Sequence, residues 1–408
     1  MKKRYLVFGL LTSVFSAKAQ QAEPVYRKQQ LKETEVQALF SFYGQDGQHS
    51  AVTGGKGTEQ LTVYAAEATI TRRPDSVQTL QVNIGADVIT SASTDNIDYV
   101  ISSASRSDIR SHLGLGYSRK LGRSGITAGL RTGLSVESDY TSLPVSLSLS
   151  YTTPDGATEL QMGLQCYFDD LRWGRINKRY WRPVTLIYPI ELRYKQWFDT
   201  YTRNSYNLGF AWYQVVNRRI RVALMPELAY QKGLLSTPFH RVYFRELSLA
   251  KVENLPMERW KIPVGLQANI FAFRNLVFRA YYRFYWDNFG ITAHTFQLEV
   301  PVKLTPQLSI APHLRWYTQT ASRYFKPYKE HSTSETFYTS DSDLSAFNDI
   351  KMGLTLRYAP QARMGGHFFF DEAALRYAWY KRSDGLYAHM VTLLLDVKHS
   401  RIKPVKDL

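Results

Sequence analysis

The feature that most constrains this chain is a strict alternation of apolar and polar residues over long segments. In residues 159–168, every second position from Leu160 to Phe168 is apolar, and Glu159, Gln161, Gly163 and Gln165 alternate with them. A period of two residues is typical of a β-strand whose two faces meet different surroundings. The same alternation recurs in residues 143–151, 295–304 and 350–358. The pattern predicts an all-β fold.

The length of these segments favours a transmembrane antiparallel β-barrel over a soluble β-sandwich. Sandwich strands are usually about five or six residues long, whereas these run to ten or more. A transmembrane barrel alternates lipid-facing and lumen-facing residues over segments of about ten residues. Tryptophan prefers the membrane interface, and Trp286, Trp316 and Trp379 end their segments while Trp260 precedes one. No later stretch of the sequence approaches the ~18 apolar residues of a helical span.

Short and long connections alternate along the chain and give an even number of strands. Outer-membrane barrels have short periplasmic turns and longer extracellular loops. On this basis the chain is expected to enter and leave the barrel on the periplasmic side. Residues 169–202 are expected to form a loop, because an extra strand there breaks the even count. The sixteen predicted strands are 34–43, 60–71, 77–88, 110–119, 125–136, 142–152, 158–168, 203–216, 220–231, 261–270, 275–286, 292–303, 308–318, 349–359, 370–381 and 386–398.

The first residues predict export. Met1 to Arg4 is basic, residues 5–16 are mainly apolar, and Ala17-Lys18-Ala19 offers a cleavage site, so residues 1–19 are predicted to be a signal peptide. Its removal takes away four of the 51 Lys and Arg residues and none of the 35 Asp and Glu residues, which leaves a net charge of +12. We expect a short periplasmic tail at 20–33, a barrel at 34–400, a second tail at 401–408, and a location in the outer membrane of a Gram-negative bacterium.

The polar face of the predicted strands defines a candidate lumen. A barrel of sixteen strands is wide enough for an aqueous channel, and fixed cations lower the cost of entry for anions. Alternatively, mixed charges form salt-bridge ladders that brace the wall without selecting a solute. The predicted lumen residues are Arg131, Arg221, Arg279, Arg283, Asp287, Glu299, Lys303, Arg315, Lys351, Arg357 and Arg376.

The long loops carry the candidates for a metal site. Three histidines fall in or beside these loops, and two Ser/Asp-rich segments supply the oxygen ligands that Ca²⁺ prefers, although neither has the full calcium-loop spacing. Loop-bracing or surface histidines are the alternative. The candidates are His49, His240, His294, Asp95, Asp98, Asp341 and Asp343. Apart from Ca²⁺ no cofactor is expected.

No catalytic motif supports an enzyme. The sequence has neither an HExxH zinc motif nor a G-x-S-x-G nucleophile elbow, and its single cysteine, Cys166, excludes an intramolecular disulfide. The signal peptide and the dispersed basic residues argue against nucleic acid as a partner. Membrane lipids, including the phosphates of lipopolysaccharide, are the more natural counter-charge.

Several segments also resemble a known family. HSAVTGGKGTEQL, QKGLLSTPFHRVYF, YYRFYWDNFGITAHTFQLE and LRWYTQTASRYFKPY are similar to recurring segments of an exported family known as domain of unknown function 3570, in the same order and over nearly the whole mature chain. The resemblance implies a barrel-like protein of the outer membrane and implies no particular reaction.

Three functions therefore remain. The favoured one is a porin-like channel or transporter for small polar or anionic solutes. The second is a structural or docking barrel for envelope proteins, with its lumen plugged by the long loops. The third is a barrel enzyme or a metal-dependent redox component of the envelope, which requires the loop histidines and aspartates to meet.

Overall fold

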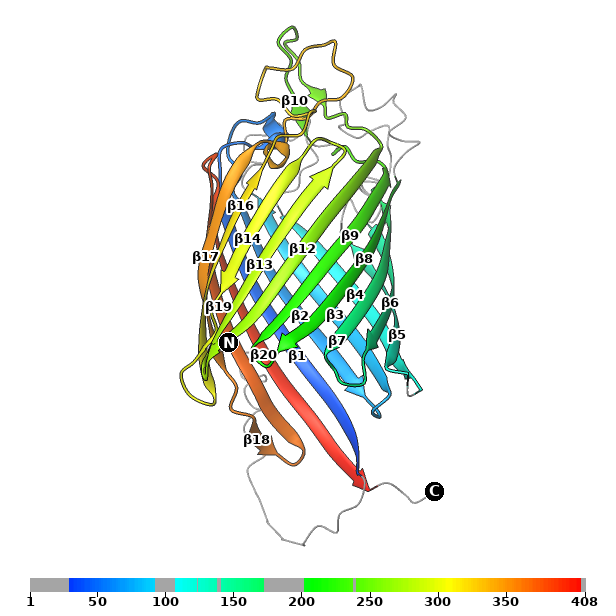
Figure 1. Ribbon diagram of the computed structural model, residues 1–408. Helices are drawn as coiled ribbons and strands as arrows, with labels where there is room; N and C mark the ends of the chain where they lie inside the picture. The colour runs from blue at the N-terminus through cyan, green and yellow to red at the C-terminus, as the bar shows by residue number, and fades with distance from the viewer. Residues whose placement is uncertain are drawn as a thin grey trace, which may run out of the picture.

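Sixteen long antiparallel strands close into a barrel in the computed structural model of the chain (Figure 1). The structure describes residues 29–91, 107–122, 124–137, 141–171, 202–237 and 240–404. Each wall strand pairs with its neighbours in chain order, and β20 pairs with β1 from Gln29–Pro404 to Asp46–Tyr387. Because the last strand closes on the first, the wall has no free edge.

The wall strands are tilted and long, and most exceed eleven residues. Their bounds are β1 Gln29–Asp46, β2 Leu61–Arg73, β3 Gln78–Ser91, β4 Ser107–Leu121, β5 Ile126–Val136, β6 Thr141–Thr152, β7 Thr158–Asp170, β8 Thr202–Asn217, β9 Ile220–Gly233, β12 Glu258–Phe273, β13 Leu276–Asp287, β14 Thr292–Glu299 continued by β15 Val302–Lys303, β16 Leu308–Gln319, β17 Phe347–Tyr358, β19 Phe368–Arg382 and β20 Tyr387–Pro404.

Smaller elements lie outside the wall. These are the pair β10 Arg241–Val242 and β11 Lys251–Val252, the short strand β18 Ala362–Gly365, and the 3₁₀ turns η1 Ala51–Thr53 and η5 Ser342–Leu344. Nowhere in the described ranges is there a helix with the length and apolar character needed to cross a bilayer.

The sixteen predicted strands are all present, and the short and long connections separate as expected. The short turns lie at the same end of the barrel as the start of β1 and the end of β20, and the long loops lie at the other end (Figure 1). The first and last strands extend into the segments expected as tails. β1 already begins at Gln29 and β20 continues to Pro404, and the two strands pair with each other there. The segment 172–201 lies outside the described residues.

The strands present an apolar face outward. Directly paired residues share a face of a sheet, so Leu298 lies with Ala280 and Leu314, and its side chain is 41% exposed. Large apolar residues are exposed in the same way around the barrel, including Leu113, Leu147, Met162 and Leu356. Such a band is stable against lipid tails and unfavourable against water. The fold is therefore that of a transmembrane barrel.

Aromatic side chains gather on this outer face near the ends of the strands. Tyr230 stacks on Trp260 with ring centroids 4.3 Å apart, and Tyr206 lies on the other side of Tyr230 at 6.4 Å. Trp286 and Trp316 are also exposed, at 40% and 42%. Amphipathic rings at this position are typical of the interface between lipid tails and headgroups.

The outward apolar face makes a prediction about neighbouring residues of β14. Leu298→Arg places a charge in lipid near the middle of the strand and should lower the free energy of unfolding by about 2–4 kcal/mol. Gln297→Arg places the same charge on the inner face, beside Arg315 in the register, and should have a much smaller effect. Urea unfolding in lipid vesicles measures both, and equal losses of stability would contradict the assignment of the two faces.

Candidate functional site

The inner face of the wall carries the predicted lumen residues. The strand register connects Arg131 with Gln81, Arg279 with Glu299, and Lys303 with Arg357, all on the face opposite Leu298. The remaining members of the predicted set share this face by the same register.

Most of these cations form ion pairs with carboxylates on a strand one or two positions away in the wall. In each pair a guanidinium nitrogen of one strand lies 2.5 to 4.0 Å from a carboxylate oxygen of another. The pairs are Arg221–Glu159, Arg279–Glu299, Arg283–Glu227, Arg315–Asp349 and Arg357–Glu372. For these residues the contacts fit the alternative interpretation, in which ion pairs between strands brace the wall.

A second group of inward cations makes no ion pair within the described part of the chain. Arg131 instead donates from Nη2 to the Gln81 side-chain oxygen at 2.5 Å. Lys351 and Arg376 lie within electrostatic range of His313, which is 5% exposed and has no hydrogen-bond partner for either ring nitrogen among the described residues. Gly353 pairs with His313 across the sheet, and a Cβ there would lie 2.7 Å from the imidazole Cε1. We call Lys351, Arg376 and His313 the basic cluster.

Asp287 shares the inner face of the wall but is closed to any solute. Its side chain is fully buried and accepts hydrogen bonds from the Tyr285 hydroxyl, the backbone N–H groups of Phe289 and Ile291, and the Arg259 guanidinium. It fixes the tight turn between β13 and β14. The prediction that it lines an open lumen was wrong, because the sequence spacing does not reveal that it caps this turn.

Three loop segments pack together at the end of the barrel that carries the long loops. We call residues 47–59, 234–257 (without 238–239) and 320–346 the mouth assembly (Figure 1). Val242 and Phe244 are fully buried in it, and Phe244 meets Tyr338 edge to face with centroids 4.8 Å apart. Asn254 and Tyr338 exchange backbone hydrogen bonds of 2.8 and 3.1 Å. The loops at the mouth therefore form a small packed unit of their own.

A carboxylate stabilises the last of these segments. Glu335 accepts hydrogen bonds from Lys326, from His331 Nδ1 at 2.6 Å and from the Ser332 backbone N–H at 3.0 Å. Partial burial opposes ionisation, but these donors outweigh it and lower the pKa of Glu335 to about 2. His331 is itself buried and its Nε2 lies 2.9 Å from the Thr339 carbonyl.

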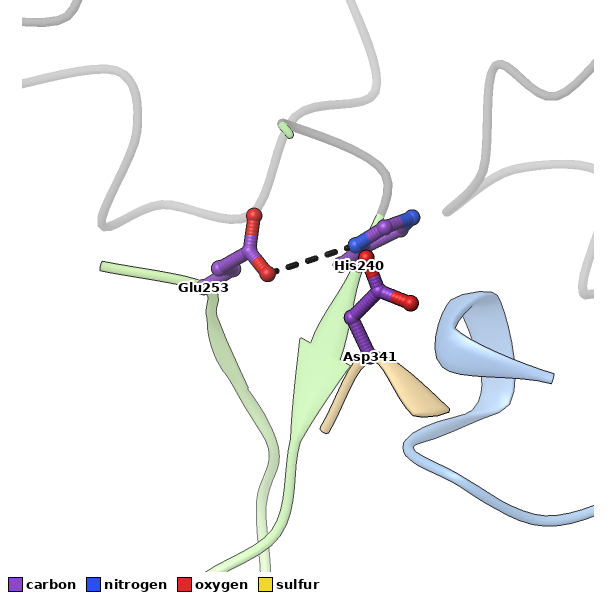
Figure 2. Close-up of side chains that lie close together, drawn as sticks. All are labelled: His240, Glu253 and Asp341. Carbon is purple, nitrogen blue, oxygen red and sulfur yellow. Dashed lines mark hydrogen bonds and ion pairs between the residues drawn. The ribbon is translucent and has the colours of Figure 1, made fainter. Parts of the chain in front are cut away.

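Three potential metal ligands meet inside the mouth assembly (Figure 2). His240 Nδ1 lies 3.4 Å from Glu253 Oε1, and the nearest ligand atoms of His240, Glu253 and Asp341 all lie within 4.8 Å of one another. The Glu253 side chain is 2% exposed and that of His240 is 19% exposed. We call these residues the mouth triad.

The charges of the mouth triad are closely coupled. Burial alone would lower the pKa of His240, but Glu253, Asp341 and Asp343 together raise it above the ordinary value. Burial raises the pKa of Asp341, and the nearby Asp343 and Glu253 raise it further against the opposing effect of His240.

A polar cavity of about 580 Å³ lies between the mouth assembly and the wall. His240 and Asp341 line it from above, and Arg315 and Lys351 line it from the inner face of β16 and β17. The cavity therefore lies between two residues of the mouth triad and Lys351 of the basic cluster.

The other predicted metal ligands do not join the triad. His49 lies 3.2 Å from the Asp384 carbonyl, and Asp343 is bound by Arg382 at 2.5 Å. His294 lies near the loop end of β14, but its side chain faces outward, where it stacks on Tyr282 and does not reach the triad. Asp95 and Asp98 lie outside the described residues. Glu253 was not predicted, because no motif in the sequence relates it to His240.

The fold and the mouth together define a class of protein: a transmembrane β-barrel whose long loops fold over one end. The family model described as Protein of unknown function (DUF3570) matches residues 96–383. The chain belongs to this family. No curated protein matches the chain.

Solved outer-membrane proteins show a distant similarity. OccK1 (OpdK) of Pseudomonas aeruginosa is 8% identical with a TM-score of 0.42, over 91% of this chain and 99% of that one. OprD of Pseudomonas aeruginosa is 8% identical with a TM-score of 0.41, over 91% and 94% of the two chains. A bacterial polysaccharide outer membrane secretin is 10% identical with a TM-score of 0.44, over 89% and 98%. Values this low carry no argument about function.

The lowered pKa of Glu335 predicts an acid-sensitive loop. The ordinary pKa of a glutamate in the unfolded chain is near 4.5, so the stabilisation is complete above that pH and is lost as the pH falls towards 2. The protection of the amides of residues 326–339 against hydrogen exchange, taken relative to the intrinsic rate at each pH, should therefore fall between pH 4.5 and 2, while the protection of the wall strands is kept. Glu335→Gln should already exchange faster at pH 7, and unchanged protection in this variant would contradict the assigned role of the carboxylate.

The packing of Phe244 predicts a local change. Phe244→Ala removes the largest fully buried side chain of the mouth assembly and should destabilise that unit by about 3–5 kcal/mol. Because the wall is held by its own strand pairs, limited proteolysis should cut residues 241–257 and 320–346 in the variant and leave the barrel intact. Loss of the whole barrel would contradict a separately packed mouth.

Proposed function

We propose that the protein is an outer-membrane channel for small polar or anionic solutes in a Gram-negative bacterium. The observation that carries this proposal is a group of inward basic side chains on the wall of a closed barrel, among them Arg131, Lys351 and Arg376, that make no ion pair with another described residue. The predicted signal peptide and the apolar outer face support the location.

The ion-paired residues and the basic cluster contribute differently to passage. An arginine that forms an ion pair with a carboxylate on another strand adds little net charge to the lumen. Lys351 and Arg376 keep a positive potential at the wall, and an anion that approaches them replaces part of its hydration with these donors. Lys351 also lines the cavity under the mouth, so the cavity offers a polar path towards the cluster.

A docking barrel is the second candidate, and the packed mouth assembly is the observation that favours it. Loops that bury Val242 and Phe244 form a defined surface rather than an open rim. Envelope proteins, or lipopolysaccharide phosphates near exposed cations such as Lys329 and Arg323, would be the partners of that surface.

Conductance distinguishes the two candidates. The mature barrel in a planar bilayer should show stable current steps with a reversal potential that favours anions. The double variant Lys351→Gln, Arg376→Gln should lower the anion preference, since a unit charge ~4 Å from the ion path contributes about 1 kcal/mol in water, or about fivefold.

The matched control is Arg221→Gln with Glu159→Gln, which removes one ion pair and leaves the net charge unchanged. Its selectivity should equal that of the unaltered barrel. A folded barrel that stays silent in the bilayer would overturn the channel and favour the docking function.

A further inference from the structure

We propose that the mouth triad, His240, Glu253 and Asp341, binds a divalent transition-metal ion such as Zn²⁺ or Mn²⁺. The site goes beyond the proposed channel and does not depend on it. Its ligands come from three separate stretches of the mouth assembly, one before β10, one after β11 and one before η5.

The spacing of the ligand atoms fits one shared ion. Zinc binds imidazole nitrogen and carboxylate oxygen at about 2.0–2.2 Å, so two ligands of a tetrahedral ion lie about 3.4 Å apart. His240 Nδ1 and Glu253 Oε1 are separated by 3.4 Å, and all three nearest ligand atoms fall within 4.8 Å. In Figure 2 the Glu253 carboxylate and the ring nitrogen of His240 face each other, with the Asp341 carboxylate beside them.

The carboxylates are held in place by other groups, as in known metal sites. The Thr237 backbone N–H donates to Glu253 Oε2 at 2.6 Å, and the Thr339 hydroxyl donates to Glu253 Oε1. The Asp341 backbone N–H donates to the same Thr339 hydroxyl at 3.0 Å. One Asp341 oxygen accepts from the Asp343 N–H at 3.0 Å. Thr339 therefore links two of the three ligands.

Charge and burial favour a cation at this place. The buried carboxylate of Glu253 and the partly exposed carboxylate of Asp341 lie within 4.8 Å of each other, and their mutual repulsion is relieved when a positive charge lies between them. His240 supplies at most one such charge. A divalent ion supplies two and leaves the imidazole neutral, which is the form that binds metals.

The ligand types select the class of ion. One imidazole and two carboxylates suit first-row transition metals, whereas Ca²⁺ binds through oxygen ligands alone. This changes the calcium expectation from the sequence, since Asp343 is bound by Arg382 and does not join Asp341 on an ion. Three protein ligands leave positions open, and His240 and Asp341 both border the polar cavity. Water or an anionic solute group would occupy the open positions.

Direct binding tests the proposal. The mature refolded barrel is stripped with a chelator and titrated calorimetrically with Zn²⁺, Mn²⁺ and Ca²⁺ in turn. One equivalent of Zn²⁺ or Mn²⁺ should bind at least tenfold more tightly than Ca²⁺. Titration with Co²⁺ should give visible absorption bands typical of nitrogen and oxygen ligands. A folded barrel that binds none of these transition metals above background would overturn the proposal, because a His240–Glu253 ion pair alone would then explain the geometry.

Variants locate the ion. Asp341→Asn and His240→Ala should each weaken metal binding by tenfold or more, and hydrogen exchange of residues 240–254 and 339–341 should no longer slow on metal addition. His49→Ala is the matched control, since it removes another mouth histidine and should bind metal normally. Circular dichroism checks that each barrel is folded.

Metal binding that is unchanged in both triad variants would place the ion elsewhere and overturn the site. Conductance is recorded on the same samples. A silent barrel that binds metal at the triad would refute the channel and leave the metal site standing.

Discussion

The closure of β1 on β20 is the constraint on which the rest of the structure depends. In hydrocarbon there is no water to satisfy a backbone N–H or C=O group, so a sheet can cross a membrane only if every strand has a partner on both sides. The pairing of Gln29–Asp46 with Tyr387–Pro404 supplies the last set of partners. It also fixes the register, since a shift by one residue would turn every apolar side chain of a strand inward. Closure and the two-faced pattern therefore support each other.

Closure also determines where charge can lie. With lipid outside, the charged residues of the wall strands must face inward, where they are crowded against one another. Most of the predicted lumen cations form ion pairs with carboxylates on other strands, as Arg279 does with Glu299 and Arg315 with Asp349. In the basic cluster, Lys351 and Arg376 make no ion pair with a described carboxylate, and Glu299 and Asp349 act on the cluster only from a longer distance. An uncompensated charge in such a wall costs stability, which is why we connect it with solutes rather than with bracing.

The wall could be predicted from the sequence because its determinants are local. The alternation of apolar and polar residues identifies each strand, and turn residues mark where the strands end. Within a strand, the odd or even position of a residue gives the face on which its side chain lies. The same rule places His294 on the outer face, because it lies two and four positions before Phe296 and Leu298 on the same strand. The extensions of β1 and β20 escaped prediction because they depend on pairing between opposite ends of the chain, and the polar residues near Gln29 give no apolar pattern.

The mouth could not be predicted because its contacts join segments that are far apart in the sequence and follow no period. Glu253 and Thr339 meet across a gap of 86 positions, and neither belongs to a motif. Asp287 was assigned to the correct face but not to its role, since only the folded turn shows that four donor groups surround it. Sequence reasoning therefore reached the residues of the candidate site, His240 and Asp341, without the partner that brings them together.

Apolar packing and polar contacts both hold the mouth assembly together. Its buried cluster consists of Val242, Phe244 and Tyr338, with Leu247 packed against it. Polar contacts supply much of the remaining cohesion, as in the bonds of Glu335 with His331 and of Glu253 with Thr237 and Thr339. An ion at the mouth triad would join three loop segments at one point, next to the cavity that leads to Lys351. Whatever occupies that point therefore affects both how tightly the loops cover the barrel and which charges a solute meets beneath them.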